Sequence, residues 1–358
     1  MGKSLASTRE KVKNHPSPAA LLRWYDRHRR ELPWRALPHE KADPYRVWLS
    51  EMMLQQTTVA TVTPYFNKFI RAWPTLTALA GADLDDILRV WAGLGYYRRA
   101  KLLHEAARIL QADFKGHFPD DEAVLRSLPG IGVYTAAAIA AIAFDKPANV
   151  VDGNVERVMA RLFLVDEPLP HAKKTLRGLA ATLVPSRRPG DYAQALMDLG
   201  ATVCTPRAPS CSACPWKRHC RAFALGKEGV FPRRRVQKAK PIRKTTAFVL
   251  LNDRGDVLLR RRPSHGLLAN MMEVPTSPWH KGEAFPQEQD FACTPAKAVW
   301  TKCPGVVRHV FSHFILEAVV FKAVVRRKHS GTWVSLADLD KQALPSVMEK
   351  IIRRACLS

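Results

Sequence analysis

With 358 residues the chain exceeds one ordinary domain, and its 47% hydrophobic and 25% charged residues exclude a disordered, collagen-like or coiled-coil protein. No apolar run approaches the ~18 residues of a membrane span, and no apolar segment near the amino terminus marks a secretory signal. The 56 Lys and Arg residues outnumber the 32 Asp and Glu residues by 24, which favours a polyanionic partner such as nucleic acid over a merely solvated basic surface.

The region from residue 17 to residue 228 is predicted to be helical. Asp43 and Pro44 form an N-cap followed by a proline in the first helical turn, and apolar residues then recur at helical spacing. Gly- and Pro-containing turns separate the helices, and no strand pattern occurs in this half. Further helices are predicted over residues 59–72, 84–91, 98–111, 121–127, 133–144, 153–164, 172–183 and 191–203.

The pattern changes after residue 228. Residues 229–244 carry seven basic and no acidic side chains with two prolines, which predicts an exposed linker. Residues 246–251 and 256–260 flank an Asn-Asp-Arg-Gly turn and predict a hairpin. With a basic tail at 1–16, the chain therefore divides into a helical region at 17–228, the linker, and an α+β domain at 245–358. In that last domain, further strands are predicted at 306–310, 314–325 and 332–335, and a helix at 344–356.

Four of the seven cysteines predict a metal site. They follow the spacing Cys-x6-Cys-x2-Cys-x5-Cys, which suits either Zn²⁺ or an iron–sulfur cluster. The long arms around one central pair favour the larger [4Fe–4S] cluster, while zinc stays open. Basic residues flank the thiols, which suits contact with phosphate. The four are Cys204, Cys211, Cys214 and Cys220.

A glycine-rich turn joins the helices predicted at 121–127 and 133–144. Gly130 and Gly132 allow close approach of the backbone to a ligand, and the following helix would direct unpaired N–H groups outward. A plain helix–helix turn is the alternative. Combined with the positive charge of the chain, the turn predicts contact with DNA phosphate.

Two carboxylates have the environments that cleavage of a glycosidic bond requires. Glu51 is predicted on the apolar face of its helix, where burial would raise its pKa and keep it protonated, unless it pairs with an arginine. Asp152 precedes the helix that begins near Gly153, whose dipole would keep it ionised, unless it serves only as an N-cap. A protonated acid beside an ionised carboxylate can protonate a leaving group and stabilise a sugar cation.

Longer motifs resemble a known family. The LPGIG turn (128–132), VDGN (151–154) and the four cysteines are similar to the helix-hairpin-helix DNA glycosylase superfamily with its iron–sulfur loop. LPWR (32–35), WLSEMMLQQT (48–57) and WAGLGYY (91–97) resemble the adenine DNA glycosylase (MutY) family. The resemblance implies an all-α glycosylase core, with the helix-hairpin-helix at about 120–144, a [4Fe–4S] cofactor and excision of adenine opposite 8-oxoguanine in double-stranded DNA.

The resemblance also implies roles for individual residues. Glu51 would protonate adenine at N7, and Asp152 would stabilise the oxocarbenium ion or add to the sugar. The adenine must leave the base stack to reach Glu51. Tyr134 stands where bifunctional relatives carry a Schiff-base lysine, so we expect little strand cleavage. Tyr134 and Asn154 would support the chemistry, and the implied DNA contacts are Arg35, Gln56, Thr57, Leu94, Tyr96, Gly130 and Gly132.

The C-terminal domain resembles the MutT-like (Nudix) fold that this family uses to read 8-oxoguanine. It lacks the Arg-Glu and Glu-Glu metal box of a hydrolase, so we expect recognition rather than hydrolysis. Phe311, Ser312 and His313 resemble the Phe-Ser-His loop of the family, with Phe311 as an apolar wedge and the other two as polar contacts. Met272 departs from the tryptophan that the family often carries there.

Two rival functions compete with adenine excision. An endonuclease III-like glycosylase and lyase for oxidised pyrimidines conflicts with Tyr134 and with the extra domain. A non-catalytic, metal-stabilised DNA-binding protein conflicts with the pair Glu51 and Asp152. We expect a cytoplasmic monomer, in a bacterium one associated with the nucleoid, without contact to a membrane. A short transit-like tail in residues 1–15 stays open, and the sequence indicates no protein partner.

Overall fold

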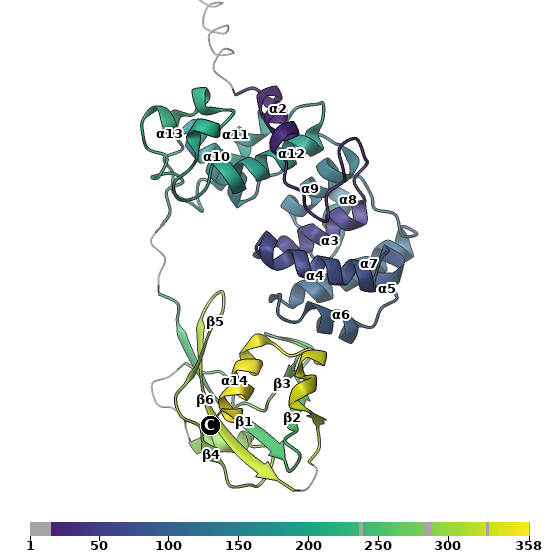
Figure 1. Ribbon diagram of the computed structural model, residues 1–358, viewed down its shortest axis with the longest axis vertical. Coiled ribbons are helices and arrows are strands. Elements are labelled where there is room, and N and C mark those ends of the chain that lie inside the picture. The colour runs from purple at the N-terminus through teal and green to yellow at the C-terminus, as the bar shows by residue number, and fades with distance from the viewer. Residues whose placement is uncertain (1–15, 236–238, 282–285, 287, 327–328, 358) are drawn as a thin grey trace, which may run out of the picture. The chain divides into compact units, whose positions relative to one another are not determined.

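A computed structural model describes residues 16–235, 239–281, 286, 288–326 and 329–357 (Figure 1). The chain forms two compact units: residues 1–80 with 105–236, and residues 81–104 with 237–358. The predicted basic tail lies outside the described residues except for Pro16. Within the described part, no helix combines the length and apolar character needed to cross a bilayer.

The first unit is built of helices, as predicted. Its described residues contain no strand, and short 3-10 and π turns connect several of the helices. Helix α7 (Arg98–Asp113) begins in the second unit and continues into the first. The remaining helices of the first unit are α2 (Pro18–His28), α3 (Pro44–Leu54), α4 (Val59–Ala72), α5 (Leu76–Ala80), α8 (Glu122–Ser127), α9 (Val133–Phe144), α10 (Gly153–Phe163), α11 (Lys173–Ala181), α12 (Pro189–Asp198) and α13 (Arg221–Ala224).

Capping side chains set the starts of the two helices that carry the carboxylates. Asp43 accepts a hydrogen bond from the Tyr45 N–H at the start of α3, and Pro44 occupies the first helical turn. Asp152 accepts one from the Val155 N–H at the start of α10. Both N-caps confirm the predicted helix starts. Glu51 and Asp152 are therefore presented by capped, regular helices.

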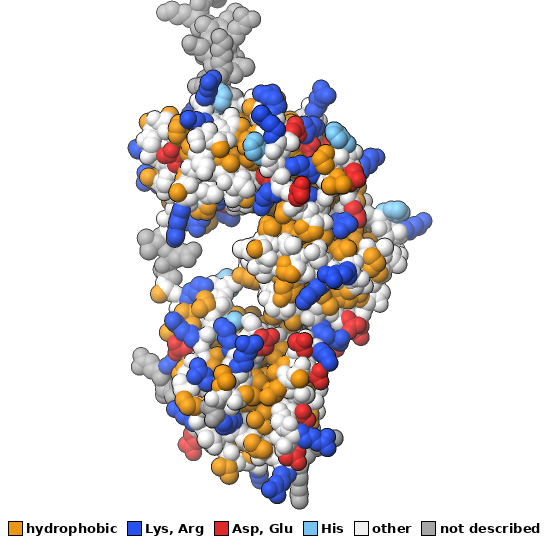
Figure 2. Space-filling model, in the orientation of Figure 1, with side chains coloured by type: hydrophobic (Ala, Val, Ile, Leu, Met, Phe, Trp, Pro, Cys, Tyr) orange, Lys and Arg blue, Asp and Glu red, His pale blue; other side chains and the backbone are white. Residues whose placement is uncertain are grey.

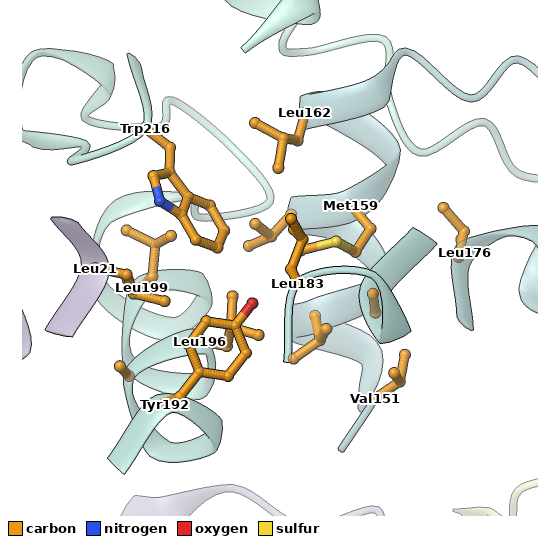
Figure 3. Packing of buried hydrophobic residues seen from close by; sticks show 14 of the residues in the cluster. Leu21, Val151, Met159, Leu162, Leu176, Leu183, Tyr192, Leu196, Leu199 and Trp216 are labelled. Carbon is orange, nitrogen blue, oxygen red and sulfur yellow. The ribbon is translucent and has the colours of Figure 1, made fainter. Parts of the chain in front are cut away.

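A buried cluster lies between α2, α10, α11 and α12 and reaches the cysteine loop (Figure 3). Trp216, between the third and fourth cysteines, is 1% exposed and packs near Tyr192 of α12, with 6.5 Å between ring centroids. Its indole N–H donates to the Ser17 carbonyl at 2.9 Å. The tryptophan thus attaches the cysteine loop to the helical core through side-chain packing.

The second unit contains a mixed sheet, as predicted for an α+β domain. Strand β1 (Ile242–Asn252) pairs in parallel with β6 (Ile315–Val325), and its other neighbour is the antiparallel strand β2 (Val257–Arg261), which completes the predicted hairpin. Helix α14 (Ser346–Cys356) contributes apolar side chains to the core of the sheet. The other elements are α6 (Leu84–Trp91), β3 (Met272–Glu273), β4 (Thr301–Lys302), β5 (Val307–Val310) and β7 (Thr332–Val334).

The predicted linker at 229–244 is partly structured at both ends. Phe231 is buried in the first unit, and the Leu169 N–H donates to the Arg233 carbonyl at 2.9 Å. Strand β1 begins at Ile242, inside the predicted linker. The exposed segment is therefore shorter than composition suggested, and its residues 236–238 lie outside the described part. On the face shown in Figure 2, Lys and Arg side chains are spread over both units.

Candidate active site

Glu51 lies on the buried side of α3 and is 6% exposed. It forms no ion pair among the described residues, so the alternative considered from the sequence, a salt bridge to an arginine, is absent there. Burial raises its pKa to about 7, aided by Asp152 and opposed by a hydrogen bond with Tyr134 and by the charge of Arg35. A carboxyl group with such a pKa is available as a proton donor near neutral pH.

A cavity adjoins Glu51. Its lining is mostly apolar, with a few polar groups, as is usual for a site that receives a small ring system. Sequence reasoning missed Arg30 and Gln194, because no spacing pattern links them to Glu51. Prominent lining residues are Trp34, Leu54, Ile142, Met197, Arg30 and Gln194.

Arg35 lines the same cavity, but its guanidinium is bound to a buried carboxylate. Its Nη1 and Nη2 donate to the two Asp198 oxygens at 2.7 and 2.8 Å, and Arg30 Nε donates to Asp198 at 2.6 Å. Bidentate pairing of this kind fixes the orientation of a guanidinium. The structure therefore gives Arg35 a place in the cavity wall rather than on an open, phosphate-binding surface; its predicted contact with DNA stays a prediction.

Asp152 and Tyr134 complete the group around Glu51. Asp152 is half-buried at the N-terminus of α10, where its carboxylate accepts from the Val155 N–H at 2.7 Å and from Asn154 Nδ2 at 2.9 Å. Tyr134 is hydrogen-bonded to Glu51, and burial together with the two carboxylates raises its pKa well above the ordinary value. The four residues predicted to carry the chemistry thus form two hydrogen-bonded pairs, Glu51 with Tyr134 and Asp152 with Asn154.

A chain of hydrogen bonds continues from Asp152 to the cysteine loop. Arg157 Nη2 donates to Asn154 Oδ1 at 2.9 Å and to the Gly200 carbonyl at 2.6 Å, and its Nε donates to the Cys204 carbonyl at 2.7 Å. A Cβ on Gly200 would lie 2.5 Å from Asn154 Cβ, so only glycine allows this approach. The polar contacts therefore tie the N-terminus of α10 to the first cysteine.

The four predicted cysteine ligands line one cavity, together with Arg161 and Glu228. They are free thiols, and burial raises the pKa of Cys214 to about 12 and that of Cys211 to about 11. In the described part of the chain, no three His, Cys, Asp or Glu side chains are arranged to hold a single metal ion. Four thiols that line one cavity are the donors that a thiolate-bound metal group requires.

The residues predicted to contact DNA from the first unit are near its surface. Gly130 has a φ of 77°, which glycine adopts readily, and a Cβ on Gly132 would meet open space. Gln56 is exposed with a φ of 58°, and Thr57 is half-buried. Left-handed backbone at a non-glycine residue is uncommon and occurs often at functional sites.

The contact residues predicted in the second unit differ in accessibility. Leu94 is buried, 5% exposed, whereas Tyr96 is 44% exposed and has a φ of 50°. The Ser312 hydroxyl donates to the Tyr96 hydroxyl at 2.8 Å, which links two predicted contact residues that are far apart in sequence. A residue that contacts DNA must be accessible, so the predicted contact suits Tyr96 better than Leu94 in this conformation.

The turn at residues 311–314 presents its polar residues and packs its aromatic ones. Ser312 and His313 are exposed, and the Phe311 N–H donates to the Phe314 carbonyl at 2.9 Å. The Phe311 ring stacks on Phe314 at 4.7 Å and contacts Trp279 at 5.6 Å. The turn therefore does not present the predicted apolar wedge; Phe311 anchors the turn instead.

Comparison with known proteins identifies the class. Residues 49–183 match the family model of HhH-GPD superfamily base excision DNA repair proteins, and residues 246–354 match the NUDIX domain. A thermostable thymine-DNA glycosylase of known structure superposes with a TM-score of 0.53 at 31% identity, covering 62% of this chain and 100% of that one. The fold and the paired carboxylates thus define a helix-hairpin-helix DNA glycosylase with an added NUDIX domain.

Full-length relatives define the family within that class. The adenine DNA glycosylase of Mus musculus is 36% identical over 93% of this chain and 76% of its own length. That of Buchnera aphidicola (strain APS) is 31% identical over 93% of this chain and 95% of its own length. The chain belongs to the adenine DNA glycosylase family. It is a DNA-binding, base-excision-repair enzyme that acts on adenine.

Proposed function

We propose that this enzyme removes adenine opposite 8-oxoguanine, with Glu51 as general acid and Asp152 as the group that stabilises the sugar cation. The observation that carries the proposal is a buried carboxyl group with a pKa of about 7 beside an apolar cavity, coupled to a second carboxylate. When two carboxyl groups lie in different environments, one can stay protonated and donate a proton while the other stays ionised and stabilises a cation.

In the proposed reaction, the adenine leaves the base stack and enters the cavity. Protonated Glu51 donates its proton to N7, and the bond between the sugar and N9 breaks with its electron pair leaving on adenine. The Asp152 carboxylate stabilises the resulting oxocarbenium ion or adds to C1′. Water then adds to C1′, displacing the Asp152 carboxylate where that has added, and its proton passes to the Glu51 carboxylate, which leaves free adenine, an abasic sugar and the enzyme in its starting protonation state.

Gln194 is our candidate for recognition of the base. It lies in the cavity wall, where its amide oxygen can accept from the N6 amino group of adenine. Guanine carries an acceptor oxygen at the equivalent position, which the amide oxygen would repel. Tyr134, in turn, cannot form an imine with the sugar, which supports a glycosylase without efficient strand cleavage.

The pH dependence should report the Glu51 acid. Protonated Glu51 is the active form, so the single-turnover rate of adenine release should fall by about tenfold per pH unit once the pH rises above the pKa of about 7. The measurement is a pH profile on enzyme already bound to lesion duplex. A rate that stays constant from about pH 6 to pH 9 would exclude a titrating acid in the chemical step.

We also propose that Ser312 and His313 read the base opposite the adenine. Both are exposed at the tip of an anchored turn, and Ser312 contacts Tyr96. Ser312→Ala combined with His313→Ala should reduce the preference for adenine opposite 8-oxoguanine over adenine opposite guanine by at least about 30-fold, because each lost polar contact to a base costs ~1–3 kcal/mol.

A matched control exists in the same unit. Ser264 and His265 form another exposed Ser-His pair, and the Ser264 backbone carbonyl accepts a hydrogen bond from Lys101 Nζ at 3.2 Å. Ser264→Ala with His265→Ala should leave the preference unchanged. Equal preferences in parent, control and Ser312/His313 variant would show that the turn does not read the lesion.

The cofactor we propose is a [4Fe–4S] cluster held by Cys204, Cys211, Cys214 and Cys220. The shared cavity and the four thiols support it. When bound, such a cluster supplies a rigid, negatively charged link that shapes the basic loop for phosphate contact. Arg207, Lys217 and Arg218 of that loop would then approach the DNA backbone.

Cys211→Ser should lower the iron content and weaken binding to DNA at least about tenfold, because a disordered basic loop loses its phosphate contacts. The helical core should survive, since Trp216 attaches the loop by packing that does not involve Cys211. Metal analysis of the parent should find about four irons per chain. Cys356→Ser, at an exposed thiol of the other unit, is the control. Stoichiometric zinc without iron in the parent would contradict the cofactor assignment.

A further inference from the structure

Arg161 of α10 is a buried cation that forms no ion pair with a carboxylate of the described residues. It is 2% exposed and is among the largest fully buried side chains. Its Nε donates to the Phe231 carbonyl at 2.9 Å, its Nη1 to the Thr205 carbonyl at 2.7 Å, and its Nη2 to the Pro206 carbonyl at 3.2 Å. The ion pairs of the described residues include none with Arg161.

The one contact of Arg161 that can carry negative charge is a cysteine. Its Nη1 lies 3.2 Å from Cys204 Sγ, and Arg161 lines the cavity that all four thiols share. Carbonyl dipoles satisfy the N–H groups of a guanidinium but do not neutralise it. Glu228 lines the same cavity, but its carboxylate contacts Cys211 at 3.7 Å and forms no ion pair with Arg161 among the described residues. Burying a charge is costly unless it is paired, so a neutral Cys204 thiol leaves this arginine without a negative charge in direct contact.

Arg157 brings a second guanidinium to the same place. It lies one helical turn before Arg161 on α10, is 7% exposed, and donates to the Cys204 carbonyl. Its guanidinium also donates to the Asn154 amide oxygen and the Gly200 carbonyl, and it forms no ion pair with a carboxylate of the described residues. Helix α10 therefore directs two buried positive charges toward the first cysteine.

A [4Fe–4S] core held by four thiolates is a net dianion, so its charge is opposite in sign and equal in magnitude to the summed charge of these two guanidinium groups. We infer that Arg161, assisted by Arg157, supplies the buried counter-charge of the cluster and thereby favours its assembly and its reduced state. The inference rests on the cofactor proposed above. It makes Arg161 a positioning and tuning residue, because its contacts lie with the cysteine loop and Phe231 rather than with Glu51 or Asp152.

A purely mechanical role is the alternative, in which Arg161 clamps the carbonyls of residues 205, 206 and 231. The two roles predict different results for substitutions that keep or remove the charge. Arg161→Lys keeps the positive charge but loses the forked hydrogen bonding, whereas Arg161→Gln loses the charge. Arg218→Gln removes the same charge from an exposed position in the cysteine loop and is the matched control.

The test is the reduction potential of the cluster in the purified, DNA-free holoenzyme, with iron per chain measured alongside. Removing a buried cation disfavours the addition of an electron, so Arg161→Gln should shift the potential to more negative values. Arg161→Lys should lie between the glutamine variant and the parent, and Arg218→Gln should match the parent because solvent screens its charge. A parent-like potential in Arg161→Gln at full iron content would overturn the inference.

If the Arg161→Gln variant does not retain its cluster, the iron content per chain replaces the reduction potential as the measurement. A counter-charge predicts that iron per chain decreases from parent to Arg161→Lys to Arg161→Gln, whereas a clamp predicts that both variants lose iron equally. Equal loss would overturn the inference. The experiment distinguishes failure of the cofactor proposal from failure of this inference. A parent enzyme without iron would refute the [4Fe–4S] cluster, whereas a fully loaded parent with unaffected variants would refute only the role of Arg161.

Discussion

Glu51→Gln should bind the lesion duplex and release almost no adenine. The amide keeps the size of the side chain, but it cannot give a proton to N7, and general acids contribute roughly 10²–10⁴-fold to such steps. The expected result is a single-turnover rate lower by on the order of 10³-fold, with the affinity for the duplex within about threefold of the parent. The measurement pairs a glycosylase assay with a binding titration.

Stability separates this loss of activity from misfolding. The Glu51 pKa rises from 4.5 in the unfolded chain to about 7 in the folded protein, so the folded state binds the proton more tightly. The stability therefore falls as the pH rises from about 4.5 to about 7, by up to ~3 kcal/mol. Glutamine does not ionise, so Glu51→Gln should be at least as stable as the parent above pH 7.

An inactive variant with lowered stability would assign the loss of activity to misfolding, and an active variant would remove Glu51 from the mechanism. Glu105→Gln, at an exposed site on α7, is the control.

Asp152→Asn should cost about as much activity for a different reason. The sugar cation loses its counter-charge, and removal of one such electrostatic group costs roughly 10²–10³-fold. Asparagine remains a good N-cap, so α10 should stay intact. We expect adenine release slower by on the order of 10³-fold and a circular dichroism spectrum equal to that of the parent.

Asp121→Asn provides a matched control for that substitution. Asp121 caps α8 in the same way, accepting from the Ala123 and Val124 N–H groups at 2.8 and 3.0 Å. Its replacement should leave the chemical step at the parental rate. Near-normal turnover by Asp152→Asn would mean that the side chain acts only as a cap.

Local patterns predicted much of the fold. The helix at 133–144 matches α9, and the hairpin between 246–251 and 256–260 matches β1 and β2, because turn residues and apolar spacing act over a few residues. The short helices α5 and α13 and the strands β3 and β4 were missed, because elements of two to five residues are too short to show a period. Pairing of β1 with β6 is a contact across the domain that no local pattern reveals.

The candidate site was predictable only in part. Glu51 and Asp152 stood out because a carboxylate on an apolar face and an N-cap before a helix are local signals. Asp198, which binds Arg35, lies 163 residues away from it, and no local signal predicts the pair. The buried contact of Arg161 with the cysteine loop was likewise not predictable, because the sequence of an amphipathic helix does not distinguish a buried arginine from one exposed to solvent. The packing of Phe311 depends on Trp279, which lies on a separate segment.

Adenine release from a duplex with one adenine opposite 8-oxoguanine tests the central claim most directly. The parent enzyme should release that adenine under single-turnover conditions, leave the strand largely uncut without alkali, and act far more slowly on an adenine opposite thymine. The Glu51→Gln variant, bound to the same duplex, should release none within the same time. Release of an oxidised pyrimidine with cleavage of the strand, and no release of adenine, would contradict the account.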